Sequence, residues 1–438
     1  MKPAPKVPYA DRRVRGRVGY ELYAAGAIFV ATYVLISAQK VGRFRIDRPA
    51  AAMFGAALMV AFGVVGPVAA VGAIDLDVLL LLLGMMLLVG GLDACGFFDH
   101  VALVIARRAR TQWELLWTLM VATAVLSALV LNDAVAFLMT PIVVRACRGM
   151  SLDPVPFLVG EGIAVNVGSV ATEVGNPQNA FIGIHSGIPF LDWAVVMAPI
   201  TIACLAVSIG VVRLAFRHRL AGPIEARPPH DTLVPVHRPG LAFTLAVLIA
   251  AVVAFFASAP DWLPAIALAG GSLVLFGLPL VNRGASARGI MGKVDWSILL
   301  FFIGLFVVIA GVESSGLRSA IQAGFTALSG GTEGGVWWLA GLSAVLSNLV
   351  SNVPAVLLLA QVVRAAPLAG QQTLWLTLAA SSTLAGNATI LGAAANVIIV
   401  QAASRQGVDI SFRDWVRAGL PATVATLVLA VALLAALP

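Results

Sequence analysis

The chain carries one pattern twice, with the two copies about 220 residues apart. Two apolar runs share the same spacing of glycines and acids, namely Ile74, Asp75, Gly84, Gly91, Asp93 and Gly96 against Val294, Asp295, Gly304, Gly311, Glu313 and Gly316. Two polar stretches match in the same way, Ser127–Asn132 with Ser347–Asn352 and Ala171–Asn179 with Ala388–Asn396. An internal duplication of this length predicts a fold built from two related halves.

Composition places both halves in a membrane. Of the 438 residues, 60% are hydrophobic and 11% are charged, whereas soluble domains carry about a quarter of charged residues. The net charge of +7 does not indicate a nucleic-acid partner, because the basic residues lie in short gaps between apolar segments, as expected beside a lipid bilayer.

Apolar segments of about 20 residues can cross a bilayer, and the two halves repeat the same order of segments. The first half has spans near 22–38, 50–71, 76–93 and 192–215, a segment 113–147 broken at Asn132-Asp133, and a segment 157–186 broken near 168–179. The second half has spans near 240–257, 262–281, 296–313 and 415–437, with broken segments 335–365 and 371–403. We interpret 113–147 and 335–365 as re-entrant hairpins, because irregular polar backbone at membrane depth must be buried in protein or line a cavity.

The predicted fold is therefore an all-α polytopic membrane protein with about 10 transmembrane helices, two re-entrant hairpins and broken helices. Each half has an odd number of spans, which makes the repeat an inverted one and is typical of secondary transporters. Four parts follow along the sequence, a basic N-terminal tail (1–21), a first repeat (22–215), a linker (216–239) and a second repeat (240–438).

Charge predicts the orientation of the chain in an inner (plasma) membrane. Of the 28 Lys and Arg residues, 20 lie in loops predicted to share one side of the membrane. These six loops are 39–49, 94–112, 145–148, 213–239, 282–293 and 405–417. The positive-inside rule makes this side cytoplasmic. The basic tail conflicts with the rule, and it either lies on the outer face or folds back along the surface.

The four polar interruptions predict one binding site. They are Ser127–Asp133, Asn166–Asn179, Ser347–Pro354 and Gly386–Asn396. Asn and Thr side chains with freed backbone groups can surround a small polar solute, and helix N-termini add positive dipole ends. A single Asn can merely join helices, but four matched clusters favour a site.

The motifs L-N-D-A-V-A-F-L-M-T-P-I-V-V, G-N-P-Q-N and S-N-V-P-A-V-L-L-L resemble the ion transporter superfamily, and within it the arsenite efflux permeases (ArsB-type) and NhaD-type sodium/proton antiporters. The resemblance runs from about residue 22 to the C-terminus. It implies hairpin tips that meet near the midplane, a scaffold part and a moving part, and a partner ATPase on the cytoplasmic loops. Some superfamily members form homodimers. Dicarboxylate relatives carry Ser-Asn-Thr at both tips, which this chain lacks.

Two intramembrane acids are candidates for ion or proton coupling, Asp133 at a hairpin tip and Glu173 inside a broken segment. A carboxylate at the bilayer centre costs about 2.5–3.5 kcal/mol and usually has a function. Glu161 lies near a helix start, so we interpret it as structural. The chain has no H-E-x-x-H or G-x-S-x-G motif, and we do not expect an enzyme.

No Arg or Lys falls near the polar clusters, which suits a neutral polyhydroxylated solute such as arsenous acid. We predict proton-coupled export of arsenite and antimonite, with a substrate site formed by Asn132, Asn176, Asn179, Asn352, Thr389 and Asn396. In this hypothesis Asp133 takes a proton from outside and releases it inside. Sodium/proton antiport and sodium- or proton-coupled anion transport are the alternatives. The three cysteines lack metal-site spacing, and we expect no cofactor other than the coupling proton or sodium ion.

Overall fold

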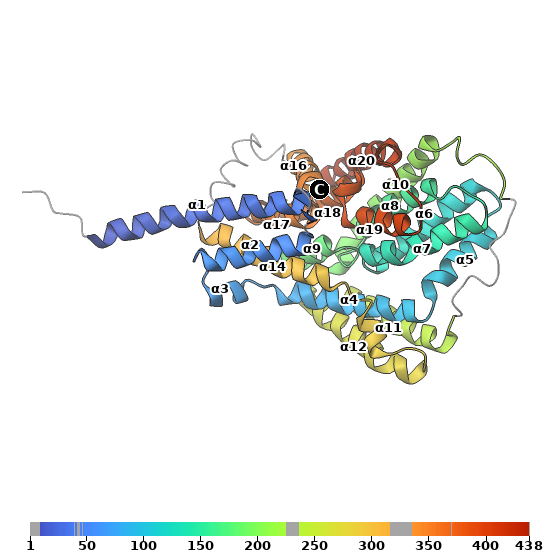
Figure 1. Cartoon of the computed structure of the whole chain (residues 1–438), viewed down its shortest axis with the longest axis horizontal. Helices are drawn as coiled ribbons and strands as arrows, with labels where there is room; N and C mark the ends of the chain where they lie inside the picture. Colours follow the sequence, from blue (N-terminus) through green and yellow to red (C-terminus); the bar gives the residue numbers. More distant parts are fainter. Residues whose placement is uncertain are drawn as a thin grey trace, which may run out of the picture. The chain divides into compact units, whose positions relative to one another are not determined.

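A computed structural model describes residues 9–38, 40–41, 44–45, 47–224, 236–315, 335–368 and 370–437 (Figure 1). This part of the chain is helical apart from two short paired strands, β1 (Lys40–Val41) and β2 (Phe44–Arg45). It forms two compact units. Unit 1 comprises 1–76 and 296–332, and unit 2 comprises 77–295 and 333–438, so each unit draws on both halves of the sequence.

Unit 1 contains α1 (Tyr9–Ala38), α2 (Arg48–Ala61), α3 (Pro67–Gly72) and α14 (Trp296–Ser314). The segment 50–71, predicted as one unbroken span, is two helices, α2 and α3. Gly63 adopts a φ of 69° after α2, and Pro67, which lacks an amide hydrogen, begins α3. Residues 9–21, predicted as a tail, continue the first span as helix; residues 1–8 lie outside the described ranges.

Unit 2 contains the remaining helices. They are α4 (Leu76–Ala94), α5 (Phe97–Arg108), α6 (Gln112–Leu129), α7 (Asn132–Gly149), α8 (Val155–Ser169), α9 (Pro177–Ser186), α10 (Phe190–Ala215), α11 (Arg238–Ala257), η2 (Pro260–Trp262), α12 (Leu263–Val281), α13 (Ala287–Met291), α16 (Gly335–Val350), α17 (Asn352–Arg364), α18 (Gln371–Ala385), η4 (Ile390–Gly392), α19 (Ala394–Arg405) and α20 (Phe412–Ala435). The segment 94–112, predicted as a loop, contains the short helix α5. Both predicted hairpins are helix pairs, α6–α7 and α16–α17, and both predicted broken segments are interrupted, as α8–α9 and α18–α19.

The duplication is visible in how glycines allow helices to cross. A Cβ on Gly84 of α4 would lie 2.2 Å from the carbonyl carbon of Ala267 in α12, and one on Gly304 of α14 would lie 2.6 Å from that of Ala52 in α2. The two glycines are equivalent in the repeat, and α2 and α12 lie in the second predicted span of each half. In each unit a helix of one half therefore packs closely on a helix of the other half, which explains why both units draw on both halves.

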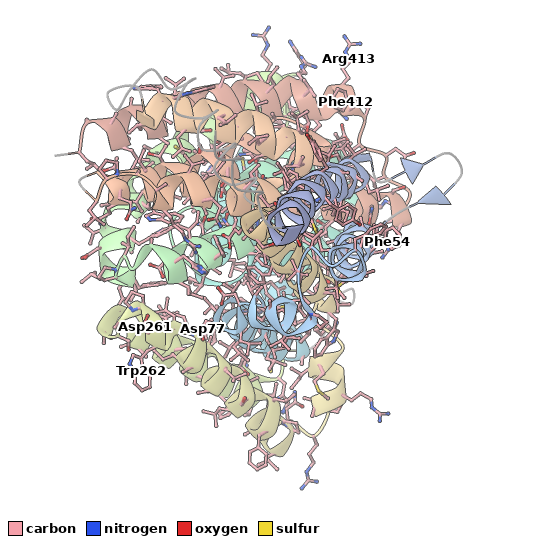
Figure 2. The ribbon with its side chains drawn as sticks, turned by 90° about the vertical axis from the view of Figure 1, so that its left-hand side faces the viewer. Phe54, Asp77, Asp261, Trp262, Phe412 and Arg413 are labelled. Carbon is pink, nitrogen blue, oxygen red and sulfur yellow. The ribbon has the colours of Figure 1, made fainter. Side chains whose placement is uncertain are left out.

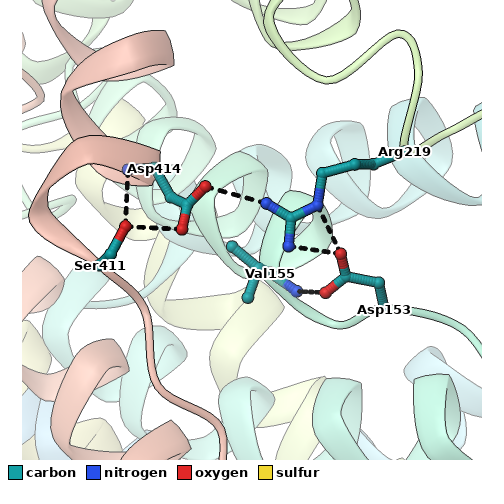
Figure 3. A network of polar contacts seen from close by, with 5 residues as sticks. All are labelled: Asp153, Val155, Arg219, Ser411 and Asp414. Carbon is teal, nitrogen blue, oxygen red and sulfur yellow. Dashed lines mark hydrogen bonds and ion pairs between the residues drawn. The ribbon is translucent and has the colours of Figure 1, made fainter.

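Arg219, which follows α10, joins three segments at one end of unit 2 (Figure 3). Its guanidinium pairs with Asp153 of the α7–α8 connection and, at 2.9 Å, with Asp414 in the first turn of α20. Ser411 caps α20 by accepting from the Asp414 amide. Asp153 also accepts from the Val155 amide at the start of α8.

Further bonds bring more of the predicted cytoplasmic loops to this end. The Ile224 amide donates to the carbonyl oxygen of Arg110, at 3.2 Å. Arg148 at the end of α7 donates to the carbonyl oxygen of Gln406, just after α19. Loops predicted to share one side of the membrane from charge alone thus lie together in unit 2.

The second hairpin opens toward the opposite end, as expected for an inverted repeat. Arg364, the last residue of α17, lies with its guanidinium carbon 5.8 Å from the ring centroid of Phe181 in α9. The segment α8–α9 begins beside the first hairpin's base and runs away from it. The bases of the two hairpins therefore contact opposite ends of this segment.

The outer faces of the helices suit a bilayer. Eight described helices are long and apolar enough to cross it. One of them, α6, is a hairpin arm. The other seven, with the pairs α2–α3, α8–α9 and α18–α19 counted as one crossing each, agree with the prediction of about 10 transmembrane helices. Phe276 of α12 is 75% exposed. Trp262, 63% exposed, lies beside Asp261 where α12 begins (Figure 2), an arrangement typical of a membrane interface.

Candidate functional site: a buried amide cluster between broken helices

The four broken segments of unit 2 each supply one helix C-terminus and one helix N-terminus. The breaks lie between α6 and α7, α8 and α9, α16 and α17, and α18 and α19. The positive N-terminal dipoles emphasised in the sequence prediction are therefore offset by an equal number of negative C-terminal ends. Such an arrangement has no built-in preference for an anion.

Asn166, near the end of α8, is the junction of a buried amide cluster. Its Nδ2 donates to Oδ1 of Asn387 and to Oδ1 of Asn396, both at 2.9 Å. Its Oδ1 accepts from Nδ2 of Asn132 at 3.4 Å. Asn166, Asn387 and Asn396 have no exposed surface and Asn132 is 3% exposed. Side chains from both repeats and from a hairpin tip thus meet at one residue.

A second set of bonds extends the cluster toward α9. Asn176 caps α9 and donates through Nδ2 to the hydroxyls of Ser169 (2.8 Å) and Thr383 (3.3 Å). Gln178 also donates to the Thr383 hydroxyl, at 3.1 Å. The Ser169 hydroxyl donates to the carbonyl oxygen of Asn166. Polar side chains here satisfy one another and the freed backbone.

Two asparagines hold the broken segments in the same way in both repeats. The side chain of each donates to the two carbonyl oxygens that the unwound backbone leaves free, at 2.7–3.1 Å, joining Asn179 to Ser169 and Thr172, and Asn396 to Gly386 and Thr389. Because their equivalent bonds recur 217 residues later, the sharp turns are a repeated part of the fold.

Two tryptophans cap the helix ends that lead into these turns. Nε1 of Trp193 in α10 donates to the carbonyl oxygen of Val170, at 3.3 Å. Nε1 of Trp415 in α20 donates to that of Asn387, at 3.0 Å. Both indoles are fully buried. Since each binds a carbonyl group at a helix C-terminus, the long helices α10 and α20 fix where α8 and α18 end.

The six residues predicted as substrate-binding come together in this region. Asn132, Asn176, Asn179 and Asn396 belong to the bonded cluster. The Thr389 hydroxyl donates to Asn348 Oδ1 at 3.3 Å. Nδ2 of Asn352 is 3.2 Å from where Gly386 would carry a Cβ. Their roles in binding stay predictions.

Sequence reasoning left other members out of the site. Asn166 and Asn387 lay inside recognised polar interruptions, so that signal could have identified them. Thr383 lies within the mainly apolar α18 and gave no such signal. Its contact with Asn176, 207 residues away in sequence, exists only in the folded chain.

The two predicted coupling acids occupy different surroundings. Asp133 is 7% exposed at the start of α7, and its amide donates to Asn132 Oδ1 at 2.8 Å. Glu173 is fully buried, with Oε2 2.5 Å from the position of a Cβ on Gly183 in α9. Neither carboxyl oxygen of Glu173 has a hydrogen-bond partner within the described residues. Glu173 therefore belongs to the broken segment but faces α9.

The cluster keeps unused polar atoms and lacks basic groups. Nδ2 of Asn387 and Oδ1 of Asn179 are buried without a partner among the described residues. No Lys or Arg is buried within 20–38, 47–224, 236–315, 335–368 and 370–437, and no three His, Cys, Asp or Glu side chains of the described residues are grouped to hold a metal ion. The site can therefore form hydrogen bonds through its amide and hydroxyl groups, and carboxyl groups lie nearby.

Several known proteins are similar in sequence to this chain over most of its length. A family model described as citrate transporter (CitMHS) matches residues 33–381. An uncharacterized transporter of Mycobacterium tuberculosis is 33% identical over 422 residues, covering 92% of this chain and 95% of that protein. The silicon efflux transporter of rice (Oryza sativa subsp. japonica) is 29% identical, covering 86% and 90%. The arsenical pump membrane protein of Escherichia coli is 26% identical, covering 94% and 98%.

A solved structure shares the fold. The YdaH transporter of Alcanivorax borkumensis superposes with a TM-score of 0.56 at 15% identity, covering 95% of this chain and 98% of that one. The fold and the repeated broken helices agree with the sequence match. Because the family model spans most of the sequence, the chain belongs to the citrate transporter (CitMHS) family of the ion transporter superfamily and is a multi-pass membrane transporter.

Proposed function

We propose that this transporter exports a small, uncharged, hydroxylated inorganic acid, with arsenous acid and its antimony analogue as the first candidates, and that inward proton movement drives the export. The observation that carries the proposal is the buried amide cluster, which has unused donor and acceptor atoms and no buried Lys or Arg in the described ranges. An O–H group of such a solute can donate to Asn179 Oδ1, and its oxygen can accept from Asn387 Nδ2.

Charge argues against a multivalent anion. Asp133, Glu161 and Glu173 are buried acids of the broken segments, and the described residues include no buried Lys or Arg. The helix dipoles offset one another. A citrate-like trianion would therefore need cations bound with it, whereas a neutral oxyacid would not.

The relatives support the same chemical class. One of them is named a silicon efflux transporter and another an arsenical pump membrane protein, and both elements form uncharged hydroxylated acids near neutral pH. Silicic acid is therefore the second candidate. We further propose Asp133 and Glu173 as coupling residues in the inner membrane, because both are acids buried beside the amide cluster.

Transport into inside-out vesicles tests the proposal. Vesicles containing the chain, with an acidic lumen and no sodium, are offered arsenite or silicic acid. A one-unit pH gradient corresponds to about 1.4 kcal/mol, so coupling of one proton per solute supports about tenfold accumulation, abolished by an uncoupler. Accumulation that requires sodium, or sodium-driven proton flux without solute uptake, would replace the proposal with one of the sodium-coupled alternatives.

A further inference from the structure

Glu161 is a carboxyl group that the proposed function has not yet used. It lies in the second turn of α8 and has no exposed surface. Its Oε1 is 2.9 Å from the hydroxyl of Thr140 in α7. Its Oε2 is buried and has no hydrogen-bond partner among the described residues.

Poor hydrogen bonding in a buried site indicates that this carboxyl is protonated. The Thr140 hydroxyl lies 2.9 Å from Oε1 and also 2.7 Å from the carbonyl oxygen of Ala136, so two acceptors share its one hydrogen. Oε2 receives no hydrogen bond within the described residues. One shared hydroxyl hydrogen is too little to stabilise a carboxylate that has no exposed surface.

The surroundings of Glu161 provide no compensating cation. Helices α6, α7, α10, α18, α19 and α20 pack against α8. Their buried titratable groups in the described ranges are Asp133, Cys147 and Cys204, none of them basic. Their charged side chains at the surface or partly exposed are Glu114, Arg145, Arg148, Asp192, Arg213, Arg405, Arg413, Asp414 and Arg417. Arg145 pairs with Asp99 at 2.9 Å instead. A carboxylate at Glu161 would thus be buried with no basic group among these neighbours to balance its charge, which is strongly unfavourable.

The second repeat shows that packing does not require the pair. The positions equivalent to Thr140 and Glu161 are Ala360 and Leu378, both fully buried. Helices α17 and α18 pack on each other as α7 and α8 do. Because apolar residues fill the same place in one half, the acid and hydroxyl in the other half have a purpose other than filling space.

Glu161 also lies between the amide cluster and the predicted cytoplasmic end. It precedes Asn166 by five residues on α8, about 7.5 Å along the helix axis. Thr140 follows Asp133 by seven residues, about two turns, so both lie on one face of α7. The order along this face is Asp133 at the cluster, then the Thr140–Glu161 pair, then the end where Asp153 meets Arg219.

We propose that Glu161 carries a proton in this structure and is the group from which the coupled proton leaves toward the cytoplasm. On release the carboxylic O–H bond breaks, the proton passes to water on the cytoplasmic side, and a carboxylate remains until Asp133 supplies the next proton. Thr140 is a positioning residue that fixes the carboxyl group. This proposal rests on proton-coupled export as proposed above.

The test compares Glu161→Gln with the wild type in inside-out vesicles. Gln keeps the size but holds no exchangeable acid proton. Solute exchange without a gradient is expected to persist, while about tenfold accumulation on a one-unit pH gradient falls to none. Glu161→Leu introduces the residue type found at the equivalent position, Leu378, and should give the same result as Glu161→Gln. Thr140→Ala should shift the pH profile of accumulation, and Asp261→Asn, at an exposed acid, should change nothing.

Infrared spectroscopy supplies an independent measurement on the purified wild type. The carbonyl stretch of buried protonated carboxyls should be present at neutral pH and should lose one component in Glu161→Gln, while any contribution from the equally buried Glu173 remains. Wild-type accumulation by the Gln and Leu variants, or an unchanged infrared band, would overturn the role of Glu161. If the wild type itself exchanges solute without responding to the pH gradient, the proposed coupling fails, and the infrared band alone then decides whether Glu161 is protonated.

Discussion

Asn166 should be energetically coupled to Asn396 across the two repeats. The single bond that they share, Nδ2 to Oδ1 at 2.9 Å, is fully buried. Hydrogen bonds between membrane helices contribute about 0.6 kcal/mol on average and about 1.7 kcal/mol at most. Asn166→Ala removes two such bonds and a longer one to Asn132, so we expect the free energy of unfolding to fall by about 1–3 kcal/mol.

A double-mutant cycle isolates the shared bond. The unfolding free energies of the wild type, Asn166→Ala, Asn396→Ala and the double variant would be measured by reversible unfolding in mixed micelles, followed by tryptophan fluorescence. We expect a coupling energy of about 0.6–1.7 kcal/mol. Asn166→Ala with Thr244→Ala, whose hydroxyl donates to the carbonyl oxygen of Gly240 in α11, serves as the control and should be additive within about 0.5 kcal/mol.

The cycle can refute the reasoning about the cluster. A coupling energy indistinguishable from that of the Thr244 control would mean that Asn166 and Asn396 do not hold the repeats together. The amides would then be placed by backbone packing alone. The unused atoms of Asn179 and Asn387 would no longer mark a rigid, preorganised site.

Three further changes test other parts of the structure. Gly84→Ala forces a Cβ against the backbone of α12 and should lower the unfolding free energy by about 1–3 kcal/mol. The control Gly210→Ala places a Cβ in open space and should be neutral or stabilising by up to about 1 kcal/mol. Equal melting temperatures of the two variants would contradict the close crossing of α4 and α12. Asp133→Asn should abolish pH-driven accumulation in vesicles while solute exchange remains, and full proton-coupled transport by this variant would remove Asp133 from the mechanism. Arg219→Gln breaks two partly exposed ion pairs and should lower the free energy of unfolding by about 0.5–2 kcal/mol, with a smaller effect at high salt. Arg217→Gln, at an exposed residue, is the control. If both variants change thermal unfolding equally, the Arg219 network does not stabilise the fold.

Many local features could be predicted from the sequence. Composition established a membrane protein, and the duplicated glycines, asparagines and acids gave two related halves. Pro177 and the glycines of the polar stretches indicated where helices break, because these residues favour backbone conformations that a helix excludes. The segment 50–71 is not the one continuous helix that was predicted, because Gly63 and Pro67 interrupt an apolar run whose hydropathy alone resembles one helix.

Only the tertiary structure decided which residues meet. Asn166 contacts Asn387 and Asn396, 221 and 230 positions away, and no periodicity in the sequence specifies such partners. The pairing of Glu161 with Thr140, which turned an acid interpreted as structural into a candidate proton carrier, depends on how α7 packs on α8. Backbone preferences are local and can be recognised in a short stretch of sequence, whereas the partner of a side chain depends on packing between distant segments that fold against each other.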